Sequence, residues 1–213
     1  MRLLALCDVV QLRAADVIGE PGQAVSHVYF PIDGFISLLA SADKGPGLEV
    51  GMVGSEGMLG LHWVLGVGSS PLRAVVQGAG ASWRLSSPAF CQALADSDDL
   101  RVVLLRYAQV CLAQGATSAV CLRYHEIGPR LARCLLMTED RAGQAIFPVT
   151  QVFLASMLGV RRVGVTAAAG RLQKQGLIAY RRGILQVLDR PALLAASCSC
   201  YARDLLDYRS VMR

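Results

Sequence analysis

Residues 151–176 read QVFLASMLGVRRVGVTAAAGRLQKQG, and this pattern predicts two short helices joined by a tight turn. Thr150 comes just before the first helix, expected over 151–158, and threonine is a typical N-cap because its hydroxyl accepts a hydrogen bond from a first-turn amide. Gly159 follows, and glycine supplies the left-handed backbone conformation that such a turn needs. The second helix is expected over 160–174.

The second helix is amphipathic, with Val165, Ala168 and Leu172 predicted to face inward at spacings typical of a buried helical face. The residues expected to face outward are Arg161, Arg162, Thr166, Ala169 and Gln173. Two arginines in a first helical turn oppose the helix dipole, so their presence favours an anionic partner outside the chain.

A basic hairpin is predicted to follow these helices. Two β-rich runs within 177–188 surround the turn sequence Arg181-Arg182-Gly183. Helix, turn, helix and basic hairpin together are typical of a winged helix-turn-helix, in which the second helix enters the major groove of DNA and the wing contacts phosphates.

Positive charge is concentrated in the same region. The formal net charge is +5, and residues 141–190 hold eight basic residues and one acidic residue, whereas residues 1–95 hold five basic and seven acidic residues. This asymmetry indicates a polyanionic partner, either nucleic acid or an anionic membrane. On charge alone, a solvated basic face is an equal alternative.

The first 96 residues predict a β-rich domain, and a length of 213 residues supports one or two domains. The expected strands lie at 25–30, 34–38, 48–53, 74–76 and 81–85, with turn residues at 31–34 and 44–47. Short strands at this spacing suggest a small sandwich or barrel.

A long helix is expected from Ser97, a candidate N-cap, to about residue 127. A coiled-coil-like stripe at spacings of four and three is formed by Leu100, Leu104, Tyr107, Cys111, Gln114, Ser118 and Cys121. We expect this stripe to pair with the same helix of a second copy, with packing against the chain's own β-domain as the alternative. The small residues Ala113, Gly115, Ala116 and Ala119 would let a partner helix approach closely.

Residues 151–178 resemble the DNA-binding domain of the Crp/Fnr family of bacterial transcription regulators. The segments HVYFPIDGFISL at 27–38 and VGSEGMLG at 53–60 resemble that family's cyclic-nucleotide-binding-type barrel. The resemblance implies an α+β fold with an N-terminal double-stranded β-helix or jelly-roll barrel (1–96), a dimerisation helix (97–127) and a C-terminal winged helix-turn-helix (128–213).

The function implied is that of a homodimeric transcription regulator, with double-stranded DNA and RNA polymerase as partners. It would read a pseudo-palindromic operator through the helix at 161–174. The alternative, motivated by Val163 and Ala167, is a ligand-binding or protein-interaction module that has lost sequence-specific DNA binding.

The recognition helix departs from the best-known family pattern, Arg-Glu-Thr-Val-(Gly/Ser)-Arg. In that pattern the first Arg, the Glu and the last Arg contact bases. The run at 162–167 is RVGVTA, so Arg162 matches the first of these residues and could bind guanine O6 and N7. Val163 and Ala167 lack the polar groups of the residues they replace. A different operator is therefore expected, with Arg161 and Thr166 either adding discrimination or touching phosphate. The predicted DNA-binding residues are Thr150, Gln151, Arg161, Arg162, Thr166, Gln173, Arg181 and Arg182.

The sensor motif is degenerate as well. Family members that bind cyclic AMP carry Gly directly before Glu, and Arg-(Ser/Thr)-Ala a short loop later. Here Ser55 separates Gly54 from Glu56, and Arg73 stands where the small hydroxyl residue is expected. Cyclic nucleotide is therefore not expected in the usual manner, and the effector is an unknown small molecule. The predicted effector pocket consists of Glu56, Gly57, Arg73, Ala74 and Tyr107.

Other functions are not expected from this sequence. Cys198-Ser199-Cys200 has no partner pair, so no metal site is predicted, and only Cys7 stands where an iron–sulfur cluster would need several N-terminal cysteines. No nucleophile or nucleotide-binding motif supports an enzyme. Seven cysteines without framework spacing, no signal peptide and no long apolar run predict a cytoplasmic protein that does not enter the membrane.

Overall fold

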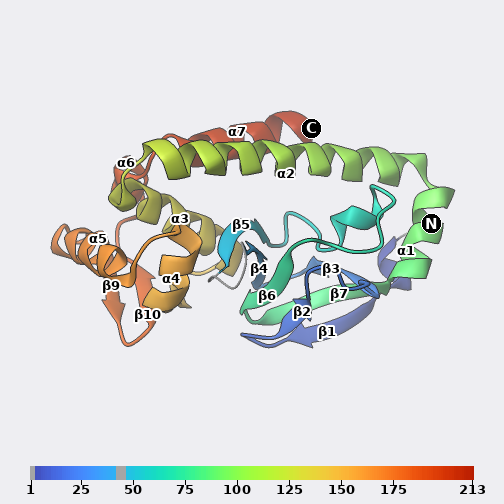
Figure 1. Cartoon of the computed structure of the whole chain (residues 1–213), viewed down its shortest axis with the longest axis horizontal. Coiled ribbons are helices and arrows are strands. Elements are labelled where there is room, and N and C mark those ends of the chain that lie inside the picture. Colours follow the sequence, from blue (N-terminus) through green and yellow to red (C-terminus); the bar gives the residue numbers. More distant parts are fainter. Residues whose placement is uncertain (1–2, 42–46) are drawn as a thin grey trace.

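The N-terminal part of the chain folds into two antiparallel sheets that enclose an apolar interior (Figure 1). The computed structural model describes residues 3–41 and 47–213, and residues 44–46 of the turn expected at 44–47 lie outside them. One sheet has the order β1 (Asp8–Leu12), β7 (Gly80–Ser86) and β3 (His27–Pro31), and the other has the order β2 (Val17–Gly19), β6 (Arg73–Gly78), β4 (Phe35–Ala40) and β5 (Leu48–Val53). Two 3-10 helices, η1 (Leu3–Leu6) and η2 (Leu61–Trp63), complete the domain.

The five strands expected from the sequence are present, and β1 and β2 were not predicted. Ile36, Val53 and Val76 from three neighbouring strands bury their side chains between the sheets. The turn between β3 and β4 requires Gly34, which has a φ of +69°, because a Cβ there would lie 2.3 Å from the carbonyl oxygen of Gly78.

Two helices connect this barrel to the rest of the chain. α1 (Ser87–Asp96) packs Phe90 against the barrel, and α2 (Asp98–Tyr124) begins after Ser97, whose hydroxyl accepts from the amide of Leu100 at 3.2 Å. At about 1.5 Å per residue, α2 is a rod of roughly 40 Å. It runs along the whole barrel and on to the C-terminal domain (Figure 1).

The stripe predicted to pair two copies of α2 packs within the chain instead. Leu104, Tyr107 and Cys121 are buried, and Leu104 and Tyr107 join the core that holds Phe90. The pairing expectation for this face is therefore wrong, and the alternative, packing against the chain's own β-domain, describes Leu104 and Tyr107.

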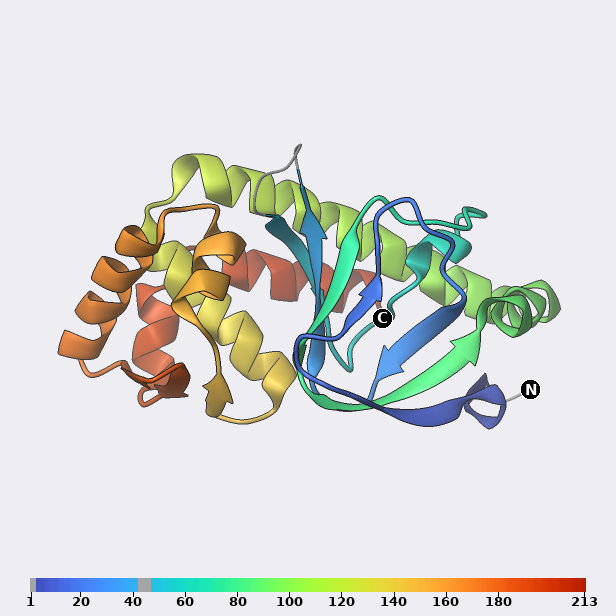
Figure 2. The same ribbon diagram turned by 60° about the horizontal axis from the view of Figure 1, so that its bottom comes forward.

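The C-terminal domain is a winged helix-turn-helix. Its elements are α3 (Ile127–Ala142), β8 (Ile146–Pro148), α4 (Gln151–Leu158), α5 (Arg162–Lys174), β9 (Ile178–Arg181), β10 (Ile184–Val187) and α6 (Arg190–Ala196). Strands β9 and β10 form the predicted hairpin, and β8 adds a third antiparallel strand beside β10. Figure 2 shows α5 at the end of the molecule farthest from the barrel.

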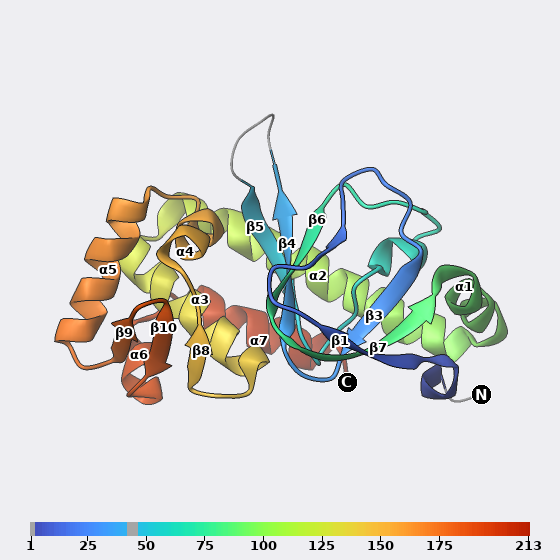
Figure 3. The same ribbon diagram turned by 90° about the horizontal axis from the view of Figure 1, so that it is seen from below.

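The last helix, α7 (Cys200–Val211), returns along α2 toward the barrel (Figure 3). Asp204 pairs with Arg133 of α3 at 2.6 Å, and the Tyr208 hydroxyl donates to the carbonyl oxygen of Glu56 at 2.8 Å. Phe35 and Met52 of the barrel belong to the same core as the C-terminal domain, so the two domains are packed together.

Among the described residues, no single helix is long and apolar enough to cross a membrane. Within the described part of the chain, α4 and α5 taken together have the length and apolar composition of a membrane span, but these two helices are bent by 105° at the turn between them.

Candidate nucleic-acid interface

The first turn of α5 presents a polar network to solvent. The side-chain oxygen of Gln151, the first residue of α4, accepts from Arg162 Nε at 3.2 Å and from the Thr166 hydroxyl at 3.0 Å. Arg161, Arg162 and Thr166 are all exposed, as predicted from the sequence. The network holds the Arg162 side chain in one direction before any ligand arrives, which lowers the entropy cost of using it for recognition.

The turn between α4 and α5 is built as expected. The Thr150 hydroxyl accepts from the amide of Phe153 at 3.1 Å and caps α4, and Gly159 ends that helix with a φ of +59°. Arg130 of α3, itself buried, donates to the carbonyl oxygen of Leu158 and satisfies a helix-end carbonyl that no backbone amide of α4 reaches. These contacts set the angle at which α5 leaves the domain.

The inner face of α5 is buried in the domain core through Val165, Ala168 and Leu172, as predicted. Ala169 was expected to face outward and is instead 2% exposed, because it lies four residues after Val165 on the same side of the helix. Val163 has the opposite character, since it is 80% exposed although it is apolar. The predicted site residues did not include it.

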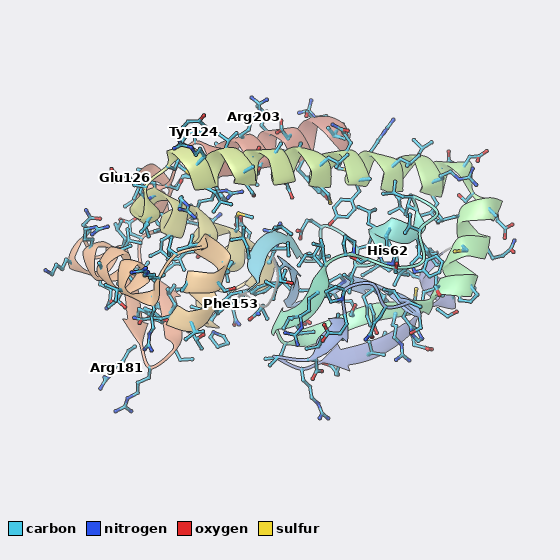
Figure 4. All side chains as sticks on the ribbon, in the orientation of Figure 1. His62, Tyr124, Glu126, Phe153, Arg181 and Arg203 are labelled. Carbon is cyan, nitrogen blue, oxygen red and sulfur yellow. The ribbon has the colours of Figure 1, made fainter. Side chains whose placement is uncertain are left out.

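The wing carries two exposed arginines at its tip. Arg182 and Gly183 have φ values of +53° and +79°, the left-handed pair that a two-residue hairpin turn requires. Figure 4 shows Arg181 pointing away from the protein at this tip. Tyr180 donates its hydroxyl to the carbonyl oxygen of Val149 at 2.8 Å, and burial raises the pKa of Tyr180, which keeps this donor protonated.

The amide of Gln173, predicted to contact DNA, donates to the carbonyl oxygen of Tyr180 at 3.4 Å. This contact ties α5 to the wing. Gln173 therefore positions these two elements relative to each other in the structure described.

Six exposed basic side chains lie on α5, in the turn before it and on the wing. We call them the basic surface, and they are Arg161, Arg162, Arg171, Lys174, Arg181 and Arg182. None of the six forms an ion pair within the described part of the chain, whereas Arg141 and Arg190, at the two ends of the same basic region, are both paired with carboxylates. The prediction from sequence omitted Arg171 and Lys174, although both lie on the same helix as Arg162.

The predicted effector residues do not assemble into one pocket. Arg73 is exposed and pairs with Glu20 at 3.3 Å, while Ala74 is buried inside the barrel. Glu56 instead pairs with Arg141 of α3 at 2.8 Å, so it joins the barrel to the C-terminal domain.

Only Gly57 and Tyr107 come together as expected. The Tyr107 hydroxyl approaches Gly57 so closely that a Cβ there would lie 1.9 Å from it. Tyr107 is 5% exposed, and burial raises the pKa of its hydroxyl well above the usual range. The tyrosine side chain therefore fills the space between the barrel and α2 at this point.

A barrel joined by a long helix to a winged helix-turn-helix is the architecture of a class of DNA-binding regulators. Residues 129–196 match the family model of the Crp-like helix-turn-helix domain. No curated protein matches the chain.

Solved structures share the whole fold. FixK2 from Bradyrhizobium japonicum is 15% identical, with a TM-score of 0.76 over 90% of this chain and 98% of FixK2. A CRP-family transcriptional regulator from Thermus thermophilus is 18% identical, with a TM-score of 0.70 over 88% of this chain and 97% of its own. CLP from Xanthomonas campestris, a c-di-GMP-responsive global regulator, is 18% identical, with a TM-score of 0.68 over 87% of this chain and 96% of CLP.

The resemblance to the Crp/Fnr family is thereby confirmed, because the chain carries that family's helix-turn-helix domain within that family's fold. The matched helix-turn-helix domain is of a type that binds DNA.

Proposed function

We propose that this chain is a homodimeric, sequence-specific DNA-binding regulator that reads a pseudo-palindromic operator through α5. The observation that carries the proposal is the basic surface, in which six exposed cationic groups, none of them ion-paired within residues 3–41 and 47–213, gather on α5, the turn before it and the wing. Two of them, Arg161 and Arg162, lie where α5 begins, a position at which positive charge opposes the helix dipole. A DNA phosphate backbone would compensate this local cost.

Base reading is assigned to the exposed first turn of α5. Arg162 can donate two hydrogen bonds to guanine O6 and N7, and its contact with Gln151 holds it ready to do so. The adjacent Val163 is 80% exposed and offers its methyl groups to the C5-methyl of thymine. An operator that contains both guanine and thymine in each half-site follows from this pair.

Phosphate contacts are assigned to the remaining cations of the basic surface. Arg181 and Arg182 lie on the wing, and Thr150 and Gln151 lie at the N-terminal end of α4, where free backbone amides also favour an anion. These contacts would fix the register of α5 in the groove without selecting bases.

Dimerisation is assigned to the face of α2 that the barrel leaves uncovered. A stripe at heptad spacing stays exposed along the helix and consists of Val102, Leu105, Gln109, Leu112 and Ala116. Leu112 at its centre is 71% exposed. Pairing of two copies along this stripe would place two α5 helices on successive turns of the major groove, about 34 Å apart.

The barrel is proposed to be a sensor or scaffold that does not hold cyclic nucleotide in the family's usual manner. Arg73 is ion-paired with Glu20, and Glu56 is ion-paired with Arg141. The Tyr107 side chain fills the space beside Gly57. A cavity inside the barrel, lined in part by Leu72 and Ala74, has a volume of about 10 Å³, and a second cavity, lined by β2, β3 and the segment between them, has a volume of about 180 Å³. Ligand pockets usually measure roughly 300 Å³ or more. A contact with RNA polymerase stays a prediction.

The proposal is tested by measuring the salt dependence of binding to a generic duplex, with and without the wing arginines. The wild-type protein should bind, and the slope of log K against log salt should be steep, because each phosphate contact contributes about −0.9. Arg181→Ala/Arg182→Ala should make the slope shallower by about 3.6 for a dimer in which both arginines of each copy contact phosphate.

The control is Arg13→Ala/Arg101→Ala, which removes equal charge from exposed positions just after β1 and on α2. It should leave the slope nearly unchanged. Absent or salt-insensitive binding by the wild-type protein would instead support the alternative, a ligand-binding or protein-interaction module without DNA binding.

A further inference from the structure

Four metal-binding side chains from two distant segments meet where α2 ends beside the start of α7. The ligand atoms of Cys121, His125, Cys198 and Cys200 all lie within 4.8 Å of one another. The Cys121 and Cys198 sulfurs are 3.5 Å apart, and the Cys200 sulfur is 3.5 Å from Nδ1 of His125. Cys198 and Cys200 have no partner pair nearby in the sequence, and the fold brings Cys121 and His125 to them.

The local structure explains how each pair is presented. Cys121 lies in the last turn of α2, and His125 is the C-cap residue that follows the helix. The amide of His125 donates to the carbonyl oxygen of Cys121 at 3.1 Å, which holds the two residues next to each other. Cys198 and Cys200 flank Ser199, the N-cap residue of α7. Contacts between α2 and α7 then bring the two pairs together, although Cys121 and Cys198 are 77 residues apart in the chain.

The spacing of the four ligand atoms fits a single tetrahedral ion. With Zn–S bonds of about 2.3 Å and Zn–N bonds of about 2.0 Å, the edges of a tetrahedral site are roughly 3.5–3.8 Å long. Two of the measured separations are 3.5 Å, and none exceeds 4.8 Å. An iron–sulfur cluster would have to fit several iron and sulfide atoms between its ligands, for which this spacing leaves no room.

The surroundings also suit a thiolate-bound cation. The three cysteine side chains are buried and form an apolar cluster of their own, at 2–7% exposure. The Arg133 guanidinium, which lines a cavity together with Cys121, is already paired with Asp204 at 2.6 Å. Three thiolates, one neutral histidine and a divalent ion would therefore leave the loaded site with a single negative charge.

An ion can also reach the cluster from outside. Thr117, His125 and Cys200 line an open groove between α2 and α7. Labels in Figure 4 place Tyr124 and Arg203, the neighbours of the site on each helix, at the outer surface of this helix pair.

We propose that Cys121, His125, Cys198 and Cys200 bind one zinc ion that fastens the start of α7 to the end of α2. Binding replaces the three thiol protons, which pass to solvent, with one Zn²⁺, and no oxidation or reduction takes place. The ion would join the proposed dimerisation helix to the last helix of the chain at the junction with the DNA-binding domain. The proposal differs from the expectation, drawn from the Cys198–Cys200 pair alone, that the chain has no metal site.

Metal analysis of the wild-type protein, purified under reducing conditions, should find one zinc ion per chain. Removing zinc with a chelator should lower the unfolding temperature by several degrees, and adding Co²⁺ to the metal-free protein should give the visible absorption of tetrahedral cobalt bound to thiolates. Cys198→Ser should bind zinc at least tenfold more weakly. Cys91→Ser, which changes a free cysteine of α1 outside the cluster, should bind zinc like the wild type.

The proposal is overturned if the wild-type protein contains no zinc and gives no cobalt spectrum. A disulfide between Cys121 and Cys198 in reduced preparations, bound iron with inorganic sulfide, or full zinc retention by Cys198→Ser would overturn it as well. The cobalt titration needs no variant, so it decides the question even if Cys198→Ser does not fold.

Discussion

Replacing Glu49 by glutamine should remove a pH-dependent loss of folding stability. Glu49 lies on β5, and its carboxylate faces the cavity between β5, α2 and α3 and accepts a hydrogen bond from the Ser37 hydroxyl. Burial raises the pKa of this carboxyl from 4.5 to about 7, although Ser37 and the positive charges of Arg141 and Arg133 act in the opposite direction. The barrel thus holds an acid that resists ionisation.

The sign and size of the effect follow from this pKa. Glu49 binds its proton more tightly in the folded state than in the unfolded state. Its contribution to the free energy of unfolding is therefore greatest below about pH 4.5 and falls as the pH rises to about 7. A difference of about 2.5 pKa units corresponds to at most about 3 kcal/mol, an upper limit because the residue is only half-buried. Glu49→Gln keeps an acceptor for Ser37 and has nothing to ionise.

Urea unfolding at pH 5 and pH 8 measures the difference in the free energy of unfolding between the wild type and Glu49→Gln. The contributions of the other titrating groups are the same in both proteins and cancel in this difference. At pH 8 Glu49→Gln should be more stable than the wild type by up to about 3 kcal/mol, and most of that difference should disappear by pH 5. Glu20→Gln, at a carboxylate that is 40% exposed in its pair with Arg73, should change stability by less than about 1 kcal/mol at either pH. A Glu49→Gln difference that does not vary with pH would show that folding does not raise the pKa of Glu49.

Three further substitutions test the packing. Leu112→Glu should leave folding intact, because the side chain is 71% exposed, but should weaken dimerisation about 100-fold or more by light scattering; Leu65→Glu, 60% exposed on the barrel, should not. Asp204→Ala should destabilise the protein by about 3–5 kcal/mol in urea, because it leaves the Arg133 guanidinium buried without its charge partner. Thr150→Ala should cost about 1 kcal/mol through loss of the α4 cap, and an unchanged unfolding midpoint would contradict that role.

The helix-turn-helix could be predicted from sequence because its signals are local. The Thr150 cap and the left-handed Gly159 set the limits of α4, and the Arg182-Gly183 turn sets those of the wing hairpin. Each depends on residues within one or two turns of chain. The structure confirms all three.

Which side of α2 packs against the barrel could not be predicted in the same way. Two stripes at heptad spacing occur on this helix, one through Leu104 and Tyr107 and one through Leu105 and Leu112. Either could have packed against the barrel, and the choice depends on tertiary contacts such as that between Tyr107 and Gly57. Helical periodicity alone carries no information about that partner.

The positions of the predicted effector residues and the meeting of the cysteine cluster could not be predicted from the sequence for a related reason. The Glu56 carboxylate forms an ion pair with Arg141, which lies far along the chain. The motif around Gly54 gives no sign of this partner. The pairing of Cys121 with Cys198 needs α7 to fold back along α2. No short-range pattern encodes either contact.

Selection of binding sites from random duplexes, with the wild-type protein and Arg162→Ala in parallel, tests whether α5 reads DNA sequence. We expect the wild-type protein to enrich a pseudo-palindrome whose half-site centres lie about 10 base pairs apart. Arg162→Ala should lose about 1–3 kcal/mol of affinity and its preference at one base pair in each half-site. Recovery of no common sequence by the wild-type protein, or an equal loss by Arg162→Ala on every sequence, would contradict the claim that the start of α5 reads DNA.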